Sequence, residues 1–151
     1  MNSYETWVSS FVKNLCEYFN LAGWNIKVEF VDENGKDSQY ADNEINSAYM
    51  FSTMTFYKPS RVDFENGELD RLTMAVVHEI VHIFLDPFHD SVCPFLSQVS
   101  SPEFSKMLET QTQKLTMVFL KSLPKNIIPK RSLSGKHNRT SKNNPKNPTV
   151  H

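Results

Sequence analysis

The chain has 151 residues, enough for one domain with a single core, and hydrophobic residues make up 39% of it. Its net charge of −1 excludes a protein that is strongly basic or acidic as a whole, and its 2 cysteines, Cys16 and Cys93, exclude a disulfide framework or a zinc ribbon. No run reaches the roughly 18 apolar residues that span a membrane, and the start has no basic and apolar leader pattern. We therefore expect a cytoplasmic protein without membrane contact.

Charge is unevenly distributed along the chain. Residues 1–123 hold 9 Lys and Arg against all 17 acidic residues, whereas residues 124–151 hold 7 basic residues and none that is acidic. The last segment is also rich in Pro, Asn and Ser, a composition that buries too little apolar surface to fold alone. We expect one domain at residues 1–123 and a disordered basic tail at 124–151. The tail is either a solubilising extension or an arm for weak contact with polyanions such as nucleic acid.

The first half of the chain predicts a helix followed by strands. Apolar residues recur at helical spacing within residues 4–19, which indicates an amphipathic helix. Apolar and polar residues then alternate over residues 24–30, the pattern of a half-buried strand. Residues 45–57 are rich in aromatic, Met and Thr side chains and predict one or two further strands, closed at residues 58–60 by Lys-Pro-Ser.

Two more helices are expected in the second half. Apolar residues cover nearly every side of residues 68–85, which indicates a buried helix that ends at Asp86 and Pro87. A later helix starts at Ser100 or Ser101, with Pro102 in its first turn, and continues to about residue 123. The predicted fold class is α+β: an N-terminal helix, a small mixed β-sheet, the buried helix, and a second C-terminal helix before the tail.

The buried helix carries the pattern His-Glu-x-x-His. Because positions i and i+4 share one face of a helix, the imidazoles of His78 and His82 can converge on one cation. Glu79 projects about 100 degrees away from His78, within reach of a metal-bound water without ligating the metal. Zinc lowers the pKa of its water, and an adjacent carboxylate takes the proton as the oxygen attacks a carbonyl group. The pattern therefore predicts a zinc-dependent hydrolase in which Glu79 is the catalytic base.

The surroundings of the motif strengthen this interpretation. Three ionisable side chains lie in an otherwise apolar helix, where burying them costs several kcal/mol unless something compensates them. A metal ion would do so. The alternative is a pair of hydrogen-bonded core histidines with Glu79 facing solvent.

A catalytic zinc usually has three protein ligands and an open fourth position. Glu109 is the leading candidate for the third ligand, because it lies in the later helix beside inward-facing residues. His89 follows the motif after the Asp86–Pro87 break and is the second candidate. Asp86 and Asp90 are further alternatives, whereas Glu103 is better placed to favour its own helix start.

Residues 73–88, which include the motif, resemble the small zincin-type metallopeptidases often encoded by bacteriophages and prophages. In those proteins, as here, a Trp-x-Ile-x-Val strand precedes the motif helix and a later helix supplies a Glu, matched by Glu109. The resemblance covers about residues 20–120. It implies a zincin fold and metallopeptidase activity with a glutamate ligand. The chain differs from metzincins, since position 85 is not Gly and the next His is His89 instead of residue 88.

The expected function is therefore zinc-dependent hydrolysis of peptide bonds in a peptide or protein substrate. His78, His82 and Glu109 would bind Zn²⁺, and Glu79 would activate its water. Two alternatives remain: a metal-dependent hydrolase of another substrate, for example RNA, and a non-enzymatic zinc-binding protein.

Overall fold

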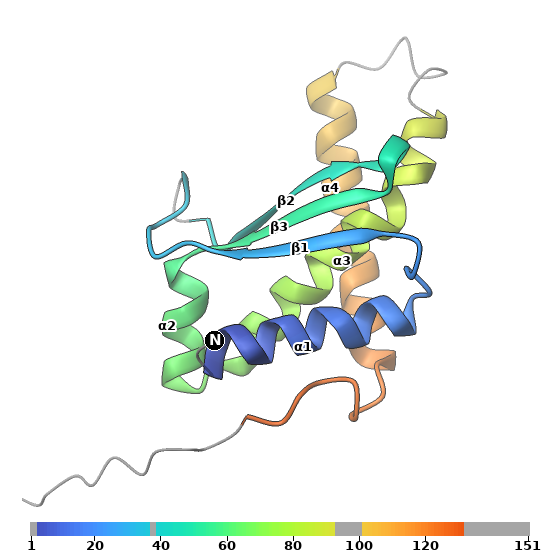
Figure 1. The fold of residues 1–151 in the computed structure, drawn as a ribbon. Coiled ribbons are helices and arrows are strands. Elements are labelled where there is room, and N and C mark those ends of the chain that lie inside the picture. Colours follow the sequence, from blue (N-terminus) through green and yellow to red (C-terminus); the bar gives the residue numbers. More distant parts are fainter. Residues whose placement is uncertain (1–2, 37–38, 93–100, 132–151) are drawn as a thin grey trace, which may run out of the picture.

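A computed structural model describes residues 3–36, 39–92 and 101–131 (Figure 1). Its elements are α1 (Ser3–Tyr18), β1 (Asn25–Phe30), β2 (Ala41–Asn46), the short 3-10 helix η2 (Ser47–Tyr49), β3 (Phe51–Phe56), α2 (Lys58–Asn66), α3 (Leu69–Val92) and α4 (Ser101–Ser122). The expected α+β class is confirmed, with an N-terminal helix, a small mixed sheet and the two later helices. Within these ranges, no helix is both long and apolar enough to cross a bilayer.

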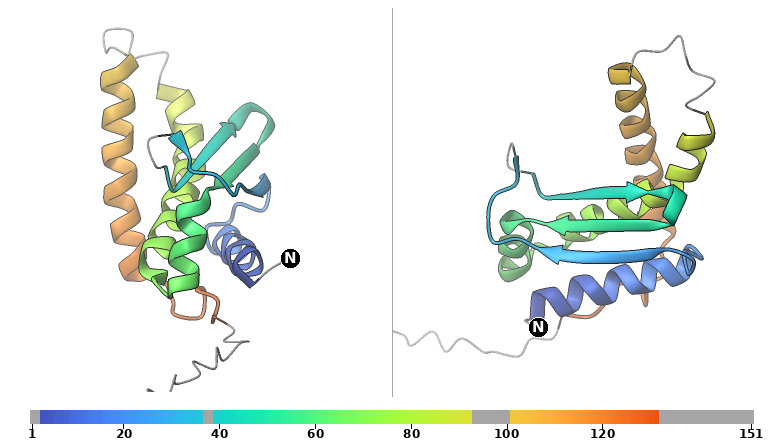
Figure 2. Two further views of the ribbon diagram at one scale, coloured as in Figure 1. Left: turned by 90° about the vertical axis from the view of Figure 1, so that its left-hand side faces the viewer. Right: turned by 45° about the horizontal axis from the view of Figure 1, so that its top comes forward.

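The three strands form one sheet in the order β1-β3-β2. The central strand β3 runs parallel to β1 and antiparallel to β2. Met54 of β3 is flanked by Val28 of β1 and Asn43 of β2, so these three side chains share one face of the sheet. Helices α1 and α3 lie against the sheet, and α4 stands on the far side of α3 (Figures 1 and 2).

Strand β2 begins earlier than the sequence pattern indicated. The expected strand region was residues 45–57, whereas β2 occupies Ala41–Asn46. Its sequence, Ala-Asp-Asn-Glu-Ile-Asn, is mostly polar, because this edge strand faces solvent on one side and a polar cavity on the other. Such a strand gives little apolar alternation.

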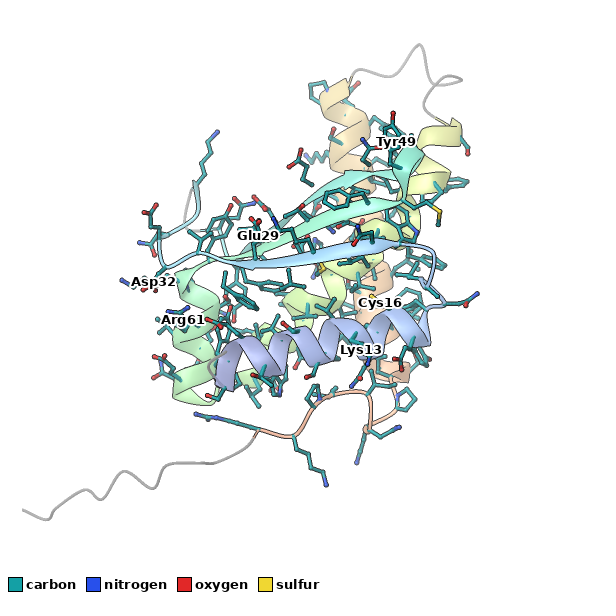
Figure 3. The ribbon with its side chains drawn as sticks, in the orientation of Figure 1. Lys13, Cys16, Glu29, Asp32, Tyr49 and Arg61 are labelled. Carbon is teal, nitrogen blue, oxygen red and sulfur yellow. The ribbon has the colours of Figure 1, made fainter. Side chains whose placement is uncertain are left out.

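A helix that the sequence analysis did not predict follows β3. Lys58–Asn66 forms α2, and Pro59 lies in its first turn, where a missing N–H needs no partner. Gly67 ends the helix with a φ of 85°, a conformation that favours glycine. Arg61 pairs with Asp32 at 3.2 Å and joins α2 to the segment after β1 (Figure 3).

Helix α3 continues through the predicted stop at Pro87 to Val92. Proline has no N–H to donate to the carbonyl one turn earlier, so the helix lacks one of its bonds at this position. Beyond the proline, the ring of His89 packs on Phe104 of α4, with ring centres 5.0 Å apart. Tertiary packing thus keeps the last turn helical.

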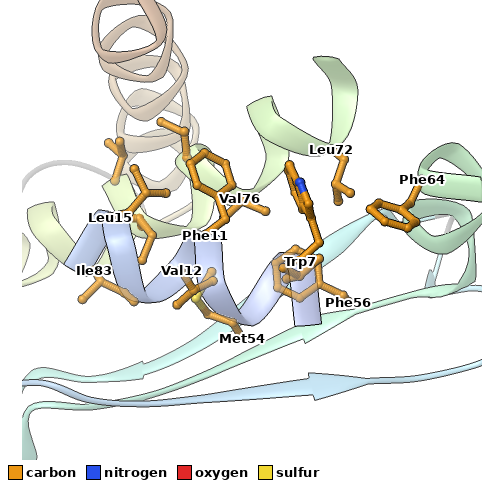
Figure 4. Packing of buried hydrophobic residues seen from close by; sticks show 14 of the residues in the cluster. Trp7, Phe11, Val12, Leu15, Met54, Phe56, Phe64, Leu72, Val76 and Ile83 are labelled. Carbon is orange, nitrogen blue, oxygen red and sulfur yellow. The ribbon is translucent and has the colours of Figure 1, made fainter. Parts of the chain in front are cut away.

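The core lies between α1, α3 and the inner face of the sheet (Figure 4). From α1, Phe11 and Leu15 are fully buried, and they pack near Val76 and Ile83 of α3. Met54 supplies the contact from β3. This packing holds α3 in place along its apolar side.

The packed part of the chain extends beyond the boundary predicted at residue 124. The indole Nε1 of Trp7 donates to the Pro129 carbonyl at 2.7 Å, and the Asn14 amide donates to the Ile127 carbonyl at 2.8 Å. Ile127 and Ile128 also contact the core. Residues 124–131 are therefore packed against α1, and residues 132–151 lie outside the described residues.

Candidate metal centre

Two imidazole rings meet on the side of α3 that faces away from α1. His78 and His82 are one turn apart, and their Nε2 atoms are separated by 3.1 Å with the ring planes at 82°. Both side chains are largely buried. The opposite side of the helix, including Val76 and Ile80, is fully buried in the core. Core packing therefore fixes the backbone from which both rings project.

Glu109 of α4 completes a group of three. Its Oε1 lies 3.2 Å from Nε2 of His78, and its Oε2 lies 3.3 Å from Nε2 of His82. Helix α4 packs on α3 through Thr112 and Thr116, which are fully buried one and two turns beyond Glu109. The structure thus brings together the three residues predicted as metal ligands.

These distances are compatible with a metal site of tetrahedral geometry. Ligand atoms at about 2.0 to 2.1 Å from the ion in tetrahedral geometry lie about 3.3 Å from one another. The two imidazole nitrogens, 3.1 Å apart, match that edge length, and each oxygen of Glu109 lies at a similar distance, 3.2 or 3.3 Å, from one of them. One ligand atom from each of the three residues lies within 4.8 Å of the other two. Burial, and then the neighbouring His78 ring, lower the pKa of His82, which favours the neutral imidazole that metals bind. Two nitrogens and one carboxylate oxygen form a donor set that zinc accepts.

The other residues considered as third ligand lie elsewhere. Among the described side chains, the single group with metal-binding spacing consists of His78, His82 and Glu109. His89 packs against Phe104, further along α3. Asp86 and Glu103 do not belong to the group, and the side chain of Asp90 is not among those described.

Glu79 borders the same cavity as the three candidate ligands. The cavity has a volume of about 280 Å³, and the Glu79 side chain on its wall is only 7% exposed. The alternative hypothesis placed Glu79 in solvent, and its burial shows that this placement is wrong. Burial, and then the carboxylates of Asp42 and Glu109, raise the pKa of Glu79 to about 8. A cation held by the three candidate ligands would act in the opposite direction, because a nearby positive charge favours the ionised carboxylate and lowers its pKa.

Strand β2 supplies the opposite wall, which the sequence did not predict. Besides the motif residues and Glu109, the cavity is lined by Gln39, Ala41, Asp42, Asn43 and Ile45. The Asn43 amide donates to the main-chain carbonyl of Glu79 at 3.0 Å and accepts from the fully buried Ser52 hydroxyl at 2.5 Å. Asn43 thus ties β2 to α3 at Glu79 itself. A lone Asn in a polar stretch carries no local signal for this role.

Searches of known protein families, curated proteins and solved structures give no significant match to this chain. The functional argument therefore depends on the site.

Proposed function

We propose that this protein is a zinc-dependent metallopeptidase in which His78, His82 and Glu109 hold the ion and Glu79 is the catalytic base. One observation carries the proposal: two imidazole nitrogens and the Glu109 carboxylate converge within 4.8 Å of one another, and a second, buried carboxyl group, that of Glu79, borders the same cavity. In zinc hydrolases of this design, three protein ligands leave one position for water.

A zinc ion held by these residues would supply a Lewis acid that lowers the pKa of a water molecule and polarises a substrate carbonyl. Glu79 would accept the proton from that water as the C–O bond forms. The same carboxyl would then deliver the proton to the leaving amine as the C–N bond breaks. Asn43 orients the base indirectly, because its amide holds the Glu79 carbonyl against β2.

Within the described part of the chain, β2 pairs with β3 alone, and its other edge favours the proposal of a peptide substrate. The amide of Tyr57 donates to the Tyr40 carbonyl at 3.1 Å, and antiparallel strands bond through every second residue. By this alternation, the main-chain groups of Ala41, Asn43 and Ile45 point away from β3. All three residues line the cavity, so an extended peptide that pairs with this edge would pass over the metal centre.

The alternatives gain less support from the described residues. The described cavity lining includes the carboxylates of Asp42, Glu79 and Glu109 but no Lys or Arg, a poor environment for a polyanion such as RNA. A purely structural zinc site is closed by four protein ligands. Three donors converge in the described part of the chain, which favours an open, catalytic site.

The test is hydrolysis of a peptide library by zinc-loaded protein, with products read by mass spectrometry. Glu79→Gln should keep its zinc and lose about 10²- to 10⁴-fold in rate. Glu109→Gln should lose zinc affinity together with activity. Glu68→Gln is the matched control, because it makes the same chemical change at an exposed position and should leave both unchanged.

Two results would refute the proposal. One is a wild-type protein, loaded with zinc, that cleaves no peptide in the library. The other is a Glu79→Gln variant that loses zinc while Glu109→Gln keeps zinc and full activity, because this would reverse the two assigned roles.

A further inference from the structure

The sheet has a second open edge, at β1, on the side away from the metal centre. Among the described residues, the strand order is β1-β3-β2, and β1 pairs with β3 alone. Helix α1 runs alongside β1 (Figures 1 and 2), and Ile26 and Val28 of the strand are only partly buried. A groove of about 400 Å³ runs between α1 and β1, with apolar walls formed mainly by Val12, Trp24, Ile26 and Val28. An exposed strand edge above an apolar groove is a template for pairing with another strand.

Main-chain hydrogen bonds alternate along β1, and this alternation determines which residues direct their N–H and C=O groups to the open edge. The amide of Asn25 donates to the Met50 carbonyl at 2.8 Å, and that of Val31 donates to the Phe56 carbonyl at 2.9 Å. Every second residue between them therefore bonds to β3. The intervening Ile26, Val28 and Phe30 direct their main-chain N–H and C=O groups to the open edge.

The outer face of β1 carries one basic and one acidic side chain. Lys27 and Glu29 form an ion pair at 2.6 Å, with side-chain exposures of 61% and 42%. Figure 3 shows Glu29 on the upper face of β1, with Lys13 and Cys16 on α1 below it. Lys27 and Glu29 stand on either side of Val28 along the strand. This arrangement is self-complementary.

We propose that β1 pairs antiparallel with β1 of a second copy of this chain, about a two-fold axis at Val28. In this register Val28 lies opposite the partner's Val28, and Ile26 lies opposite the partner's Phe30. These residues all direct main-chain groups to the edge, so each pair can exchange both hydrogen bonds. Lys27 then lies opposite the partner's Glu29, in the pair type whose side chains are closest.

The charges select this register over its neighbours. A two-fold axis at Lys27 places Lys27 opposite the partner's Lys27, and an axis at Glu29 places two glutamates opposite each other. Like charges directly opposite each other destabilise a strand pair. An axis between two residues brings outward-facing main-chain groups against inward-facing ones and loses the hydrogen bonds.

The same reasoning disfavours self-pairing through β2. That strand carries Asp42 and Glu44 and no basic residue, so an axis at Asn43 sets two acidic side chains against each other. Strand β2 also borders the metal cavity. Pairing through β1 joins the two sheets and leaves both cavities open at the outer edges of the dimer. The inference is therefore independent of the proposed peptidase activity.

The test is sedimentation equilibrium of the full-length protein under reducing conditions, over a range of concentrations. The wild-type chain should form a reversible dimer. Lys27→Glu and Glu29→Lys should each weaken it at least about tenfold, because each creates two repulsive pairs across the two-fold axis. The double variant, with both charges exchanged, should return the dissociation constant to within about threefold of the wild-type value.

Two further variants separate the interface from general effects. Lys114→Glu changes the net charge equally at an exposed position on α4 and should leave the dimer unchanged. Val28→Pro removes an N–H that points to the open edge, and should give a folded monomer by circular dichroism. A wild-type chain that stays monomeric at several hundred micromolar, or a dimer that both single charge reversals leave intact, would overturn the inference.

Discussion

Helix α3 has two buried sides with opposite chemistry. Towards α1 and the sheet it presents Leu72, Val76, Ile80 and Ile83, all fully buried and apolar. Towards α4 and β2 it presents His78, Glu79 and His82 around a polar cavity. The first side contributes to stability through packing, whereas the second holds polar groups where packing alone gives them no compensation. The two sides of α3 therefore have different roles. Packing on the apolar side fixes the helix backbone, and the fixed backbone positions the candidate metal ligands on the polar side.

The largest effect on stability is expected on the apolar side. Ile80→Ala should lower the free energy of unfolding by about 2 to 5 kcal/mol, because it opens a cavity in a fully buried position. Urea denaturation of metal-free protein measures this loss. Met74→Ala, on the same helix but partly exposed, is the control and should cost less. An Ile80→Ala cost below that of Met74→Ala would show that the two sides do not differ as described.

The periodicity of the sequence was sufficient to predict the apolar side of α3 and the shared face of the motif residues. It was not sufficient to predict which other elements line the cavity around the motif. The spacing of His78 and His82 predicts a shared face within one helix, and this is local information. The approach of Glu109 depends on how α4 crosses α3, which no local pattern encodes. The structure places Glu109 beside the two histidines and His89 against Phe104, and the role of Glu109 as a ligand stays a prediction.

Strand β2 and residues 124–131 were harder to predict for the same physical reason. Both are polar or proline-containing segments that are ordered by contacts with distant parts of the chain. Asn43 bonds to Glu79, and Pro129 accepts from Trp7 across most of the sequence. Likewise, Pro87 indicated a helix end, because the contact of His89 with Phe104 of α4 beyond the proline is not visible locally.

On the polar side, the expected stabilisation comes from zinc. At a free zinc concentration of 100 times the dissociation constant, wild-type protein should gain about 2.7 kcal/mol, and His82→Ala should gain almost none. Without metal, the two proteins should differ by less than about 1 kcal/mol, because loss of the partly buried His82 ring then changes only local contacts. Thermal unfolding with zinc and with chelator measures both quantities. His89→Ala is the control, and an equal loss of the zinc effect in that variant would count against Glu109 as third ligand.

The smallest effect on the free energy of unfolding is expected from residues 124–131, which pack against α1. Truncation after Arg131 should leave the free energy of unfolding within about 0.5 kcal/mol of the full-length value. Truncation after Leu123 should cost about 1 to 3 kcal/mol, because the Trp7 indole N–H loses its acceptor at Pro129. Equal stabilities of the two truncated proteins would show that residues 124–131 do not stabilise α1.

The central claim is that α3 and α4 together hold one zinc ion through two imidazoles and one carboxylate. X-ray absorption at the zinc edge, on protein loaded with one equivalent of zinc, tests this directly. We expect two histidine nitrogens at about 2.0 to 2.1 Å and one or two light oxygen ligands at about 2.0 to 2.2 Å. In Glu109→Gln the oxygen contribution from the carboxylate should change while both imidazoles remain. A spectrum with sulfur ligands or three imidazoles, or a wild-type protein that binds no zinc, would contradict the account.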